Sequence, residues 1–268
     1  MAIKILLNGC YGRMGRMFTQ TAAKYQDLLI VAGLDVVAPL ADGFSLPPAY
    51  PVYIVGVDKN SGVDALEGVG FDIIVDFSNP AMLNMILGLA DARSVPVIFA
   101  TTGFSEAQLG EISAASQKIP VFRSANMSIG INLMSELIKT AAAALADGFD
   151  IELVEAHHNQ KLDAPSGTAL MLADAMNETL DGGLEYVYDR HEIRAKRGKK
   201  ELGIHAIRGG TIVGEHSVIF AGSDEVIEIR HTAASRVVFA EGAVRAVRYM
   251  TAGGRAPGCY SMRDIVTA

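Results

Sequence analysis

The sequence has no tryptophan, only two cysteines and no long uncharged hydrophobic run. Cys10 and Cys259 stand near opposite ends of the chain without CxxC spacing, which argues against a disulfide framework or a cysteine zinc site and fits a reducing compartment. No uncharged stretch reaches the roughly 18 residues of a membrane span. The apolar start, "MAIKILLNG", lacks the basic segment and cleavage site of a signal peptide. We therefore expect a cytoplasmic protein.

Positive charge is also scarce. Lys and Arg number 23 against 30 Asp and Glu, which gives a formal net charge of -7. General binders of nucleic acids or anionic membranes need a surplus of Lys and Arg to neutralise phosphates. We therefore expect no nucleic acid and no membrane among the partners, and a small-molecule ligand instead. The 268 residues, half of them hydrophobic, are typical of a soluble globular protein of one or two domains.

Apolar runs alternate with helical patterns through the first half of the chain. Helices are expected over residues 13–24, 80–92 and 105–118, and apolar strands lie before and between them, including residues 3–9 and 28–35. Unbroken apolar strands that alternate with helices predict a parallel sheet with both faces covered.

The pattern changes after Ser128, which is a good N-cap for a long helix over residues 129–146. A strand is expected over residues 149–158. Residues 202–233 contain three strand-like runs broken by glycines, a pattern typical of an antiparallel meander, and a helix over residues 235–250 follows.

The first strand runs into a glycine-rich turn, "NGCYGRMG", with Gly9, Gly12 and Gly15 at three-residue spacing. Such glycines allow a tight turn, close approach of the backbone to a pyrophosphate, and close packing of helix on strand. Asp35 ends the second strand about 20 residues later, where an acid binds the adenosine ribose. The alternative is that the glycines only tighten a turn and Asp35 caps a loop. Together the features favour a Rossmann-type dinucleotide site.

The residue after Asp35 is Val36, so no basic side chain stands there to meet a 2′-phosphate, which the carboxylate would repel. We therefore predict that NADH is preferred. NADPH is the second choice, since Arg13 or Arg16 could still reach a phosphate.

Two further polar turns end predicted parallel strands. They are "FATTGF", with Thr101, Thr102 and Gly103, and "SANMS", with Asn126. Because ligands of open α/β sheets bind outside the carboxyl ends of the strands, we expect both turns beside the nicotinamide.

The stretch "EAHHNQKLDAPSGTAL", residues 155–170, is the densest group of chemically active side chains. A metal site would need further ligands for Glu155, His157 and His158, and nothing in the spacing fixes them. The candidates for those further ligands are His205, His216 and His231. An ordinary polar surface loop is the other alternative.

Acid-base chemistry explains more of this stretch. Hydride delivery to an unsaturated carbon must be matched by a proton, which His157 or Lys161 can supply. Ser166 then precedes a helix whose first N–H groups, at Gly167 and Thr168, suit a carboxylate. We therefore expect a small anionic substrate that accepts hydride.

With "NGCYGRMG", "ATTGF", "SANMSIGIN", "EAHHNQKLDAPSGTAL", "GEHSVIF" and "HTAASRVVFAEGAVRA" in this order, the sequence resembles the 4-hydroxy-tetrahydrodipicolinate reductase family over essentially its whole length. The resemblance implies a homotetramer. It implies a dinucleotide-binding domain over residues 1–126, completed by residues 239–268. It also implies an α+β substrate-binding and oligomerisation domain over residues 127–238, with a mixed, largely antiparallel sheet.

The resemblance also implies roles for single residues. His157 and Lys161 would be catalytic. Substrate would be bound by His158, Ser166, Gly167, Thr168 and Arg236. The dinucleotide would be bound by Gly9, Cys10, Tyr11, Gly12, Arg13, Met14, Asp35, Ala100, Thr101, Thr102, Ser124, Ala125, Asn126 and Met127. The chain departs from the family pattern at Ala100, often glycine, at Tyr11, often smaller, and at Val36, often basic in members that use NADPH well.

The implied reaction is reduction of 4-hydroxy-tetrahydrodipicolinate to tetrahydrodipicolinate with loss of water, in the diaminopimelate route to lysine. Two alternatives remain open at this point. One is a related NAD(P)-dependent amino or imino acid dehydrogenase, and the other is a non-catalytic dinucleotide sensor.

Overall fold

A computed structural model describes residues 1–36, 49–55, 66–191 and 194–268. The chain divides into two compact units. Unit 1 comprises Met1–Ser128 and Val237–Ala268, and unit 2 comprises Ile129–Arg236. The boundaries expected from the sequence, after residues 126 and 238, lie close to these limits.

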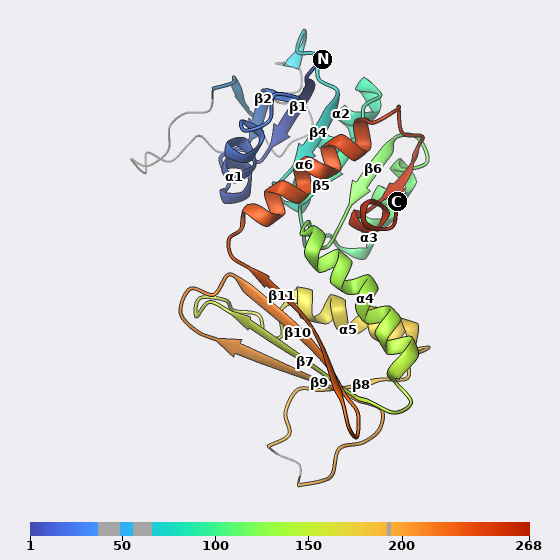
Figure 1. Ribbon diagram of the computed structural model, residues 1–268. Coiled ribbons are helices and arrows are strands. Elements are labelled where there is room, and N and C mark those ends of the chain that lie inside the picture. Colours follow the sequence, from blue (N-terminus) through green and yellow to red (C-terminus); the bar gives the residue numbers. More distant parts are fainter. Residues whose placement is uncertain (37–48, 56–65, 192–193) are drawn as a thin grey trace. The chain divides into compact units, whose positions relative to one another are not determined.

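Unit 1 is built on a sheet in which every pairing between described strands is parallel, as predicted (Figure 1). In spatial order the strands are β12 (Gly258–Tyr260), β6 (Pro120–Arg123), β5 (Val97–Phe99), β4 (Ile73–Asp76), β1 (Ile3–Asn8), β2 (Leu28–Asp35) and β3 (Val52–Ile54). The helices are α1 (Arg13–Ala22), the short 3-10 helix η2 (Pro80–Met82), α2 (Leu83–Arg93), α3 (Glu106–Ala115), α6 (Val237–Thr251) and α7 (Met262–Val266).

The central strands of unit 1 are apolar because both faces of the sheet are covered. Every residue of β4 and the last four of β1 are buried. Helix α6 packs against α1, and β12 joins the sheet beside β6, so the C-terminal segment belongs to unit 1. All strands of a parallel sheet end at the same edge. The turns that follow β1, β4, β5 and β6 are therefore gathered there, with Asp35 at the end of β2.

Unit 2 is a five-stranded mixed sheet with two helices on one face (Figure 1). In spatial order its strands are β11 (Val226–Ala233), β10 (Gly214–Ala221), β7 (Asp150–His157), β9 (Glu201–Arg208) and β8 (Glu185–Val187). The helices are α4 (Ile129–Leu145) and α5 (Gly167–Thr179). Leu153, Val218 and Phe220 are fully buried in the core beneath them.

The predicted meander over residues 202–233 is only half right. β10 and β11 form an antiparallel hairpin, but β9 pairs with β7 and β8, both in parallel. β7 lies between β9 and β10 and pairs antiparallel with β10. The sheet is therefore mixed with two pairings of each kind, rather than largely antiparallel. Turn residues suggest which neighbours can pair, but they carry no information about a strand inserted from elsewhere in the chain.

Candidate active site

Two positions in the turn between β1 and α1 have room only for glycine. Gly9 has φ +75°, and a Cβ there would lie 2.7 Å from the backbone carbonyl carbon of Phe77. A Cβ on Gly15 would lie 2.1 Å from the carbonyl oxygen of Gly9. Gly12 precedes α1 and supplies no side-chain cap, so the helix presents its first N–H groups at the turn. The turn therefore fits a pyrophosphate held by the backbone.

Asp35, the last residue of β2, is tied to this turn. Its carboxylate accepts hydrogen bonds of 2.8 Å from the backbone N–H groups of Tyr11 and Val36. Arg13 is exposed and Met14 is half-buried in the first turn of α1. Cys10 is buried, and burial raises the pKa of its thiol to about 12, so it contributes backbone rather than a reactive sulfur.

The ends of β1, β4 and β5 converge on a buried carboxylate, Asp76, which sequence reasoning missed. Asp76 accepts hydrogen bonds from Thr101 Oγ1 at 2.7 Å, Asn8 Nδ2 at 2.8 Å and Ser78 Oγ at 2.5 Å. Burial raises the pKa of Asp76, and these donors oppose the rise. The carboxylate thus anchors Thr101, whereas the next residue, Thr102, is exposed.

The turn after β6 is held by its own polar groups. Ser124 Oγ donates to the carbonyl oxygen of Asn126 at 2.9 Å, and Asn126 Oδ1 accepts from the backbone N–H of Ser128 at 2.8 Å. Ala125 is exposed and Met127 is buried. All the predicted dinucleotide residues lie in unit 1, either at the end of β2 or on the segments that follow β1, β5 and β6.

His157 is the last residue of β7 and is buried on the helix-covered side of its sheet. Its Nδ1 lies 2.6 Å from Glu155 Oε2. The His216 ring on β10 meets the His157 ring edge-on, with 5.2 Å between centroids. Burial lowers the pKa of His216 to about 4, and nearby His157 adds to this, so His216 is neutral at physiological pH.

Ser166 caps α5, as predicted from its place before the helix. Its Oγ accepts from the backbone N–H of Ala169 at 3.1 Å and lies 3.2 Å from His216 Nε2. Gly167 and Thr168 are the first residues of α5, so their N–H groups stand at the positive end of the helix dipole.

Lys161 and His158 lie on the segment between β7 and α5. Lys161 Nζ lies 2.9 Å from Asp163 Oδ1, and this contact, followed by the Gly167 N–H, holds the pKa of the Asp163 carboxyl below its usual value. Arg236 Nη2 lies 3.5 Å from His158 Nε2. Partial desolvation and then the charge of Arg236 lower the pKa of His158.

All seven predicted catalytic and substrate residues lie in unit 2. Contacts link six of them into three groups: His157 with Ser166 through Glu155, Lys161 with Gly167 through Asp163, and His158 with Arg236. Thr168, the seventh, follows Gly167 in α5. Within the described ranges no three His, Cys, Asp or Glu side chains form a group that could hold a metal ion. No helix in the described part of the chain is long and apolar enough to cross a membrane.

Sequence reasoning missed the groups that support these side chains. Arg208, on β9, reaches Glu155 across 53 positions of sequence, and His216 reaches Ser166 across 50. These contacts depend on strand pairing, which the local pattern does not reveal. Asp76 had a local signal, since "VDFS" sets an acid at the end of an apolar strand.

Known proteins match the chain from end to end. The family profile described as "Dihydrodipicolinate reductase, N-terminus" matches residues 3–127, and the one described as "Dihydrodipicolinate reductase, C-terminus" matches residues 130–266. A relative from Clostridium botulinum, named 4-hydroxy-tetrahydrodipicolinate reductase, is 44% identical over 264 residues, which is 98% of either chain. One of the same name from Caldanaerobacter subterraneus is 46% identical over 266 residues, 99% of either chain.

A solved structure shares the fold. The dipicolinate-bound dihydrodipicolinate reductase from Paenisporosarcina sp. TG-14 is 24% identical, with a TM-score of 0.79 over 99% of this chain and 100% of that one.

Proposed function

The chain belongs to the dihydrodipicolinate reductase family, and from this premise we propose that it reduces 4-hydroxy-tetrahydrodipicolinate to tetrahydrodipicolinate with loss of water, in lysine biosynthesis through diaminopimelate. Its curated relatives carry the reductase name over their whole length. A family member from Paenisporosarcina binds dipicolinate, a flat ring with two carboxylates. The substrate class is therefore a cyclic dicarboxylate.

The proposal rests on the segment from Glu155 to Thr168, which runs from the end of β7 to the start of α5. In it a buried histidine, a lysine and the N-terminus of α5 are held by contacts with Glu155 and Asp163. A reductase of a cyclic dicarboxylate needs one proton donor and cationic or N–H groups for each carboxylate. The loop, with Arg236 beside His158, supplies all of them.

We assign roles on this geometry. His157 is the acid-base group, and Lys161 is the proton donor, released from Asp163 when the substrate binds. The N–H groups of Gly167 and Thr168, capped by Ser166, hold one carboxylate, and His158 with Arg236 holds the other. A bound nicotinamide cofactor supplies the hydride.

The cofactor belongs to the glycine turn of unit 1. The residues fit such a group, because Gly9 and Gly15 let the turn pack closely against its own backbone, and α1 begins there with no side-chain cap on its first N–H groups. Asp35 accepts hydrogen bonds from ribose hydroxyls and repels a 2′-phosphate, so NADH is favoured over NADPH. Comparing kcat/KM for the two cofactors tests this, and a clear preference for NADPH would contradict it.

The outer face of the five-stranded sheet supports self-association. Ile207 and Val226 lie 51% and 63% exposed, and no described helix of unit 2 covers this face. A second copy of the same face would bury them, in line with the homotetramer expected for the family. Light scattering measures the mass, and I207E and V226E should lower it. A monomeric wild type would refute the assembly.

The reaction is tested by following oxidation of reduced nicotinamide by the purified protein. The cyclic substrate should support it, and amino acids should support neither oxidation nor reduction of the cofactor. Turnover of an amino or imino acid instead would favour the related dehydrogenase. Cofactor binding without any turnover would favour a dinucleotide sensor. The proposed location is the cytoplasm.

A further inference from the structure

One fully buried carboxylate organises the proposed site. The Glu155 side chain has no exposed surface and accepts four hydrogen bonds. Oε2 faces His157 Nδ1 at 2.6 Å and Arg208 Nη1 at 2.8 Å. Oε1 accepts from Arg208 Nη2 at 2.7 Å and from the backbone N–H of Ser166 at 3.0 Å. Arg208 thus forms hydrogen bonds with both carboxylate oxygens, while His157 and Ser166 each contact one of them.

We propose that Glu155, held by Arg208, is the positioning residue that fixes the orientation and proton distribution of His157 and joins them to the start of α5. The inference rests on the proposed role of His157 in proton transfer. Neither Glu155 nor Arg208 touches the substrate in this account. Each acts through the groups that do.

The contacts decide which ring nitrogen exchanges the proton. Burial alone would raise the pKa of Glu155, but hydrogen bonds from Arg208 and His157 outweigh it and keep the pKa below its usual value, so the carboxylate is ionised. An ionised carboxylate only accepts, so the Nδ1 of His157 carries a proton in both charge states. Proton exchange is therefore assigned to Nε2. A Cβ on Gly214 would lie 3.2 Å from this Nε2, so glycine keeps that side of the ring uncrowded.

Glu155 is the negatively charged group in direct contact with the His157 ring. His216 on β10 is kept neutral by burial, and burial also lowers the pKa of His231 on β11. The charged groups that face the pair are Arg208 on β9 and Lys161 and Asp163 in the loop. Because Arg208 and Lys161 are positive, the carboxylate of Glu155 is the group in contact with the ring that stabilises an imidazolium.

The same carboxylate holds the anion site. Through the Ser166 N–H it fixes the residue that caps α5, immediately before Gly167 and Thr168. Loss of the carboxylate should therefore reduce kcat strongly and raise KM only modestly, because the Ser166 Oγ cap to Ala169 remains.

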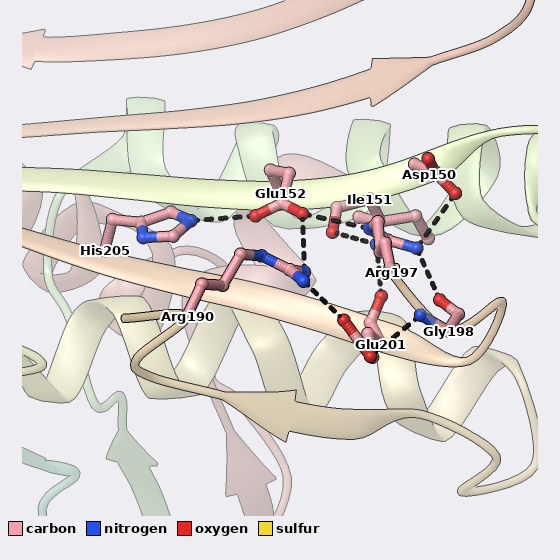
Figure 2. Close-up of polar contacts among 8 residues, drawn as sticks. All are labelled: Asp150, Ile151, Glu152, Arg190, Arg197, Gly198, Glu201 and His205. Carbon is pink, nitrogen blue, oxygen red and sulfur yellow. Dashed lines mark hydrogen bonds and ion pairs between the residues drawn. The ribbon is translucent and has the colours of Figure 1, made fainter. Parts of the chain in front are cut away.

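The test compares Glu155→Gln with Glu152→Gln. Glu152 lies on the same strand and also contacts a histidine and arginines, but on the opposite face of the sheet (Figure 2). For Glu155→Gln we expect a kcat about 10- to 100-fold lower and a kcat-pH profile whose alkaline limb moves down by about 1 pH unit. Glu152→Gln should leave the position of the profile unchanged. An unmoved profile in Glu155→Gln, or an equal shift in both variants, would overturn the inference.

Two further measurements separate the inference from folding and from the reaction itself. The double variant Glu155→Gln with Arg208→Met removes the buried carboxylate together with its partly buried guanidinium partner. It should therefore be more stable than Glu155→Gln alone, but its pH profile should remain shifted. ¹⁵N NMR of His157 reports the ring tautomer without any turnover. We expect the Nδ1–H form in the wild type and a mixture in Glu155→Gln, and an Nε2–H wild type would refute the inference. A wild type that does not reduce the cyclic substrate would instead refute the proposed function.

Discussion

Two glutamates on β7, three positions apart, make nearly the same contacts and have different consequences. Glu155 is fully buried beneath the helices and contacts His157, Arg208 and the cap of α5. The Glu152 side chain is 23% exposed on the opposite face and contacts His205, Arg197 and Arg190 (Figure 2). Alternation along the strand separates the two.

The difference lies in what surrounds each carboxylate. Around Glu152, Arg197 also binds Asp150 and the carbonyl oxygens of Ile151, Gly198 and Glu201, and Arg190 binds Glu201 (Figure 2). Through these contacts, Arg190 and Arg197, which precede β9 in the chain, bind to residues of β7. Around Glu155, burial strengthens each interaction, and one ring nitrogen remains directed toward Gly214. A Glu, a His and an Arg thus form a clamp in one place and a candidate proton-transfer site in the other.

The largest expected effect is on kcat, and it distinguishes His157, beside Glu155, from His205, beside Glu152. His157→Ala and Lys161→Ala should each lower kcat by about 10²- to 10⁴-fold, because each removes a proton donor, while binding of NADH stays nearly unchanged. His205→Ala, the matched change beside Glu152, should leave kcat within about twofold. Steady-state kinetics and cofactor titration measure this. Near wild-type turnover in both loop variants would show that the site is wrongly assigned.

The two arginines should differ in stability. Arg208→Met leaves the fully buried carboxylate of Glu155 without its guanidinium partner, with only His157 and the Ser166 N–H in contact, and should cost about 3–5 kcal/mol of unfolding free energy. Arg190→Met removes an exposed partner of Glu152 and should leave the unfolding free energy nearly unchanged. Calorimetry of both variants at one pH measures the difference. Equal losses would mean that burial does not distinguish the two networks.

The stability of the fold should also depend on pH through the buried His216, on the same face of the sheet as Glu155. Its pKa is about 4 in the folded chain against an ordinary value of 6.5. Between these values the unfolded chain binds a proton that the folded chain does not, so stability falls as pH falls from 6.5 to about 4. The loss from this group is roughly 3 kcal/mol. Thermal unfolding across this range should be less pH-dependent in His216→Gln, and an unchanged slope would contradict the assignment.

The smallest effect concerns two exposed aspartates. The Asp163 carboxylate contacts Lys161 and the Gly167 N–H, and so competes with the substrate carboxylate for the start of α5. Asp163→Asn should therefore lower KM by up to about fivefold, the size of an exposed ion pair. Asp150→Asn, which weakens a contact of Arg197 on the other face, should leave KM unchanged. A raised KM in Asp163→Asn would mean that Asp163 orients Lys161 instead of competing for it.

Much of this molecule could be predicted where the deciding interactions are local. The glycines, the apolar strands and the cap at Ser166 depend on neighbouring residues, so the parallel sheet and the start of α5 were predicted correctly. The pairing of β9 with β7 depends on distant residues. From the sequence alone, without that pairing, nothing indicates that Arg208 binds Glu155. Glu155 could then be a metal ligand or an acid on the surface. The support of the candidate site therefore stayed hidden, although its central residues were named.

The central claim is that unit 2 presents a cyclic dicarboxylate for reduction by a nicotinamide and that His157 or Lys161 adds the accompanying proton. Its most direct test is product analysis after turnover with reduced cofactor carrying deuterium at C4 of the nicotinamide. When the cofactor carries deuterium at the position from which it transfers hydride, mass spectrometry and NMR should find one deuterium atom at C4 of tetrahydrodipicolinate. Turnover of unlabelled cofactor in deuterated solvent should place none at that carbon. Product without the cofactor's deuteron, or no product at all, would contradict the account.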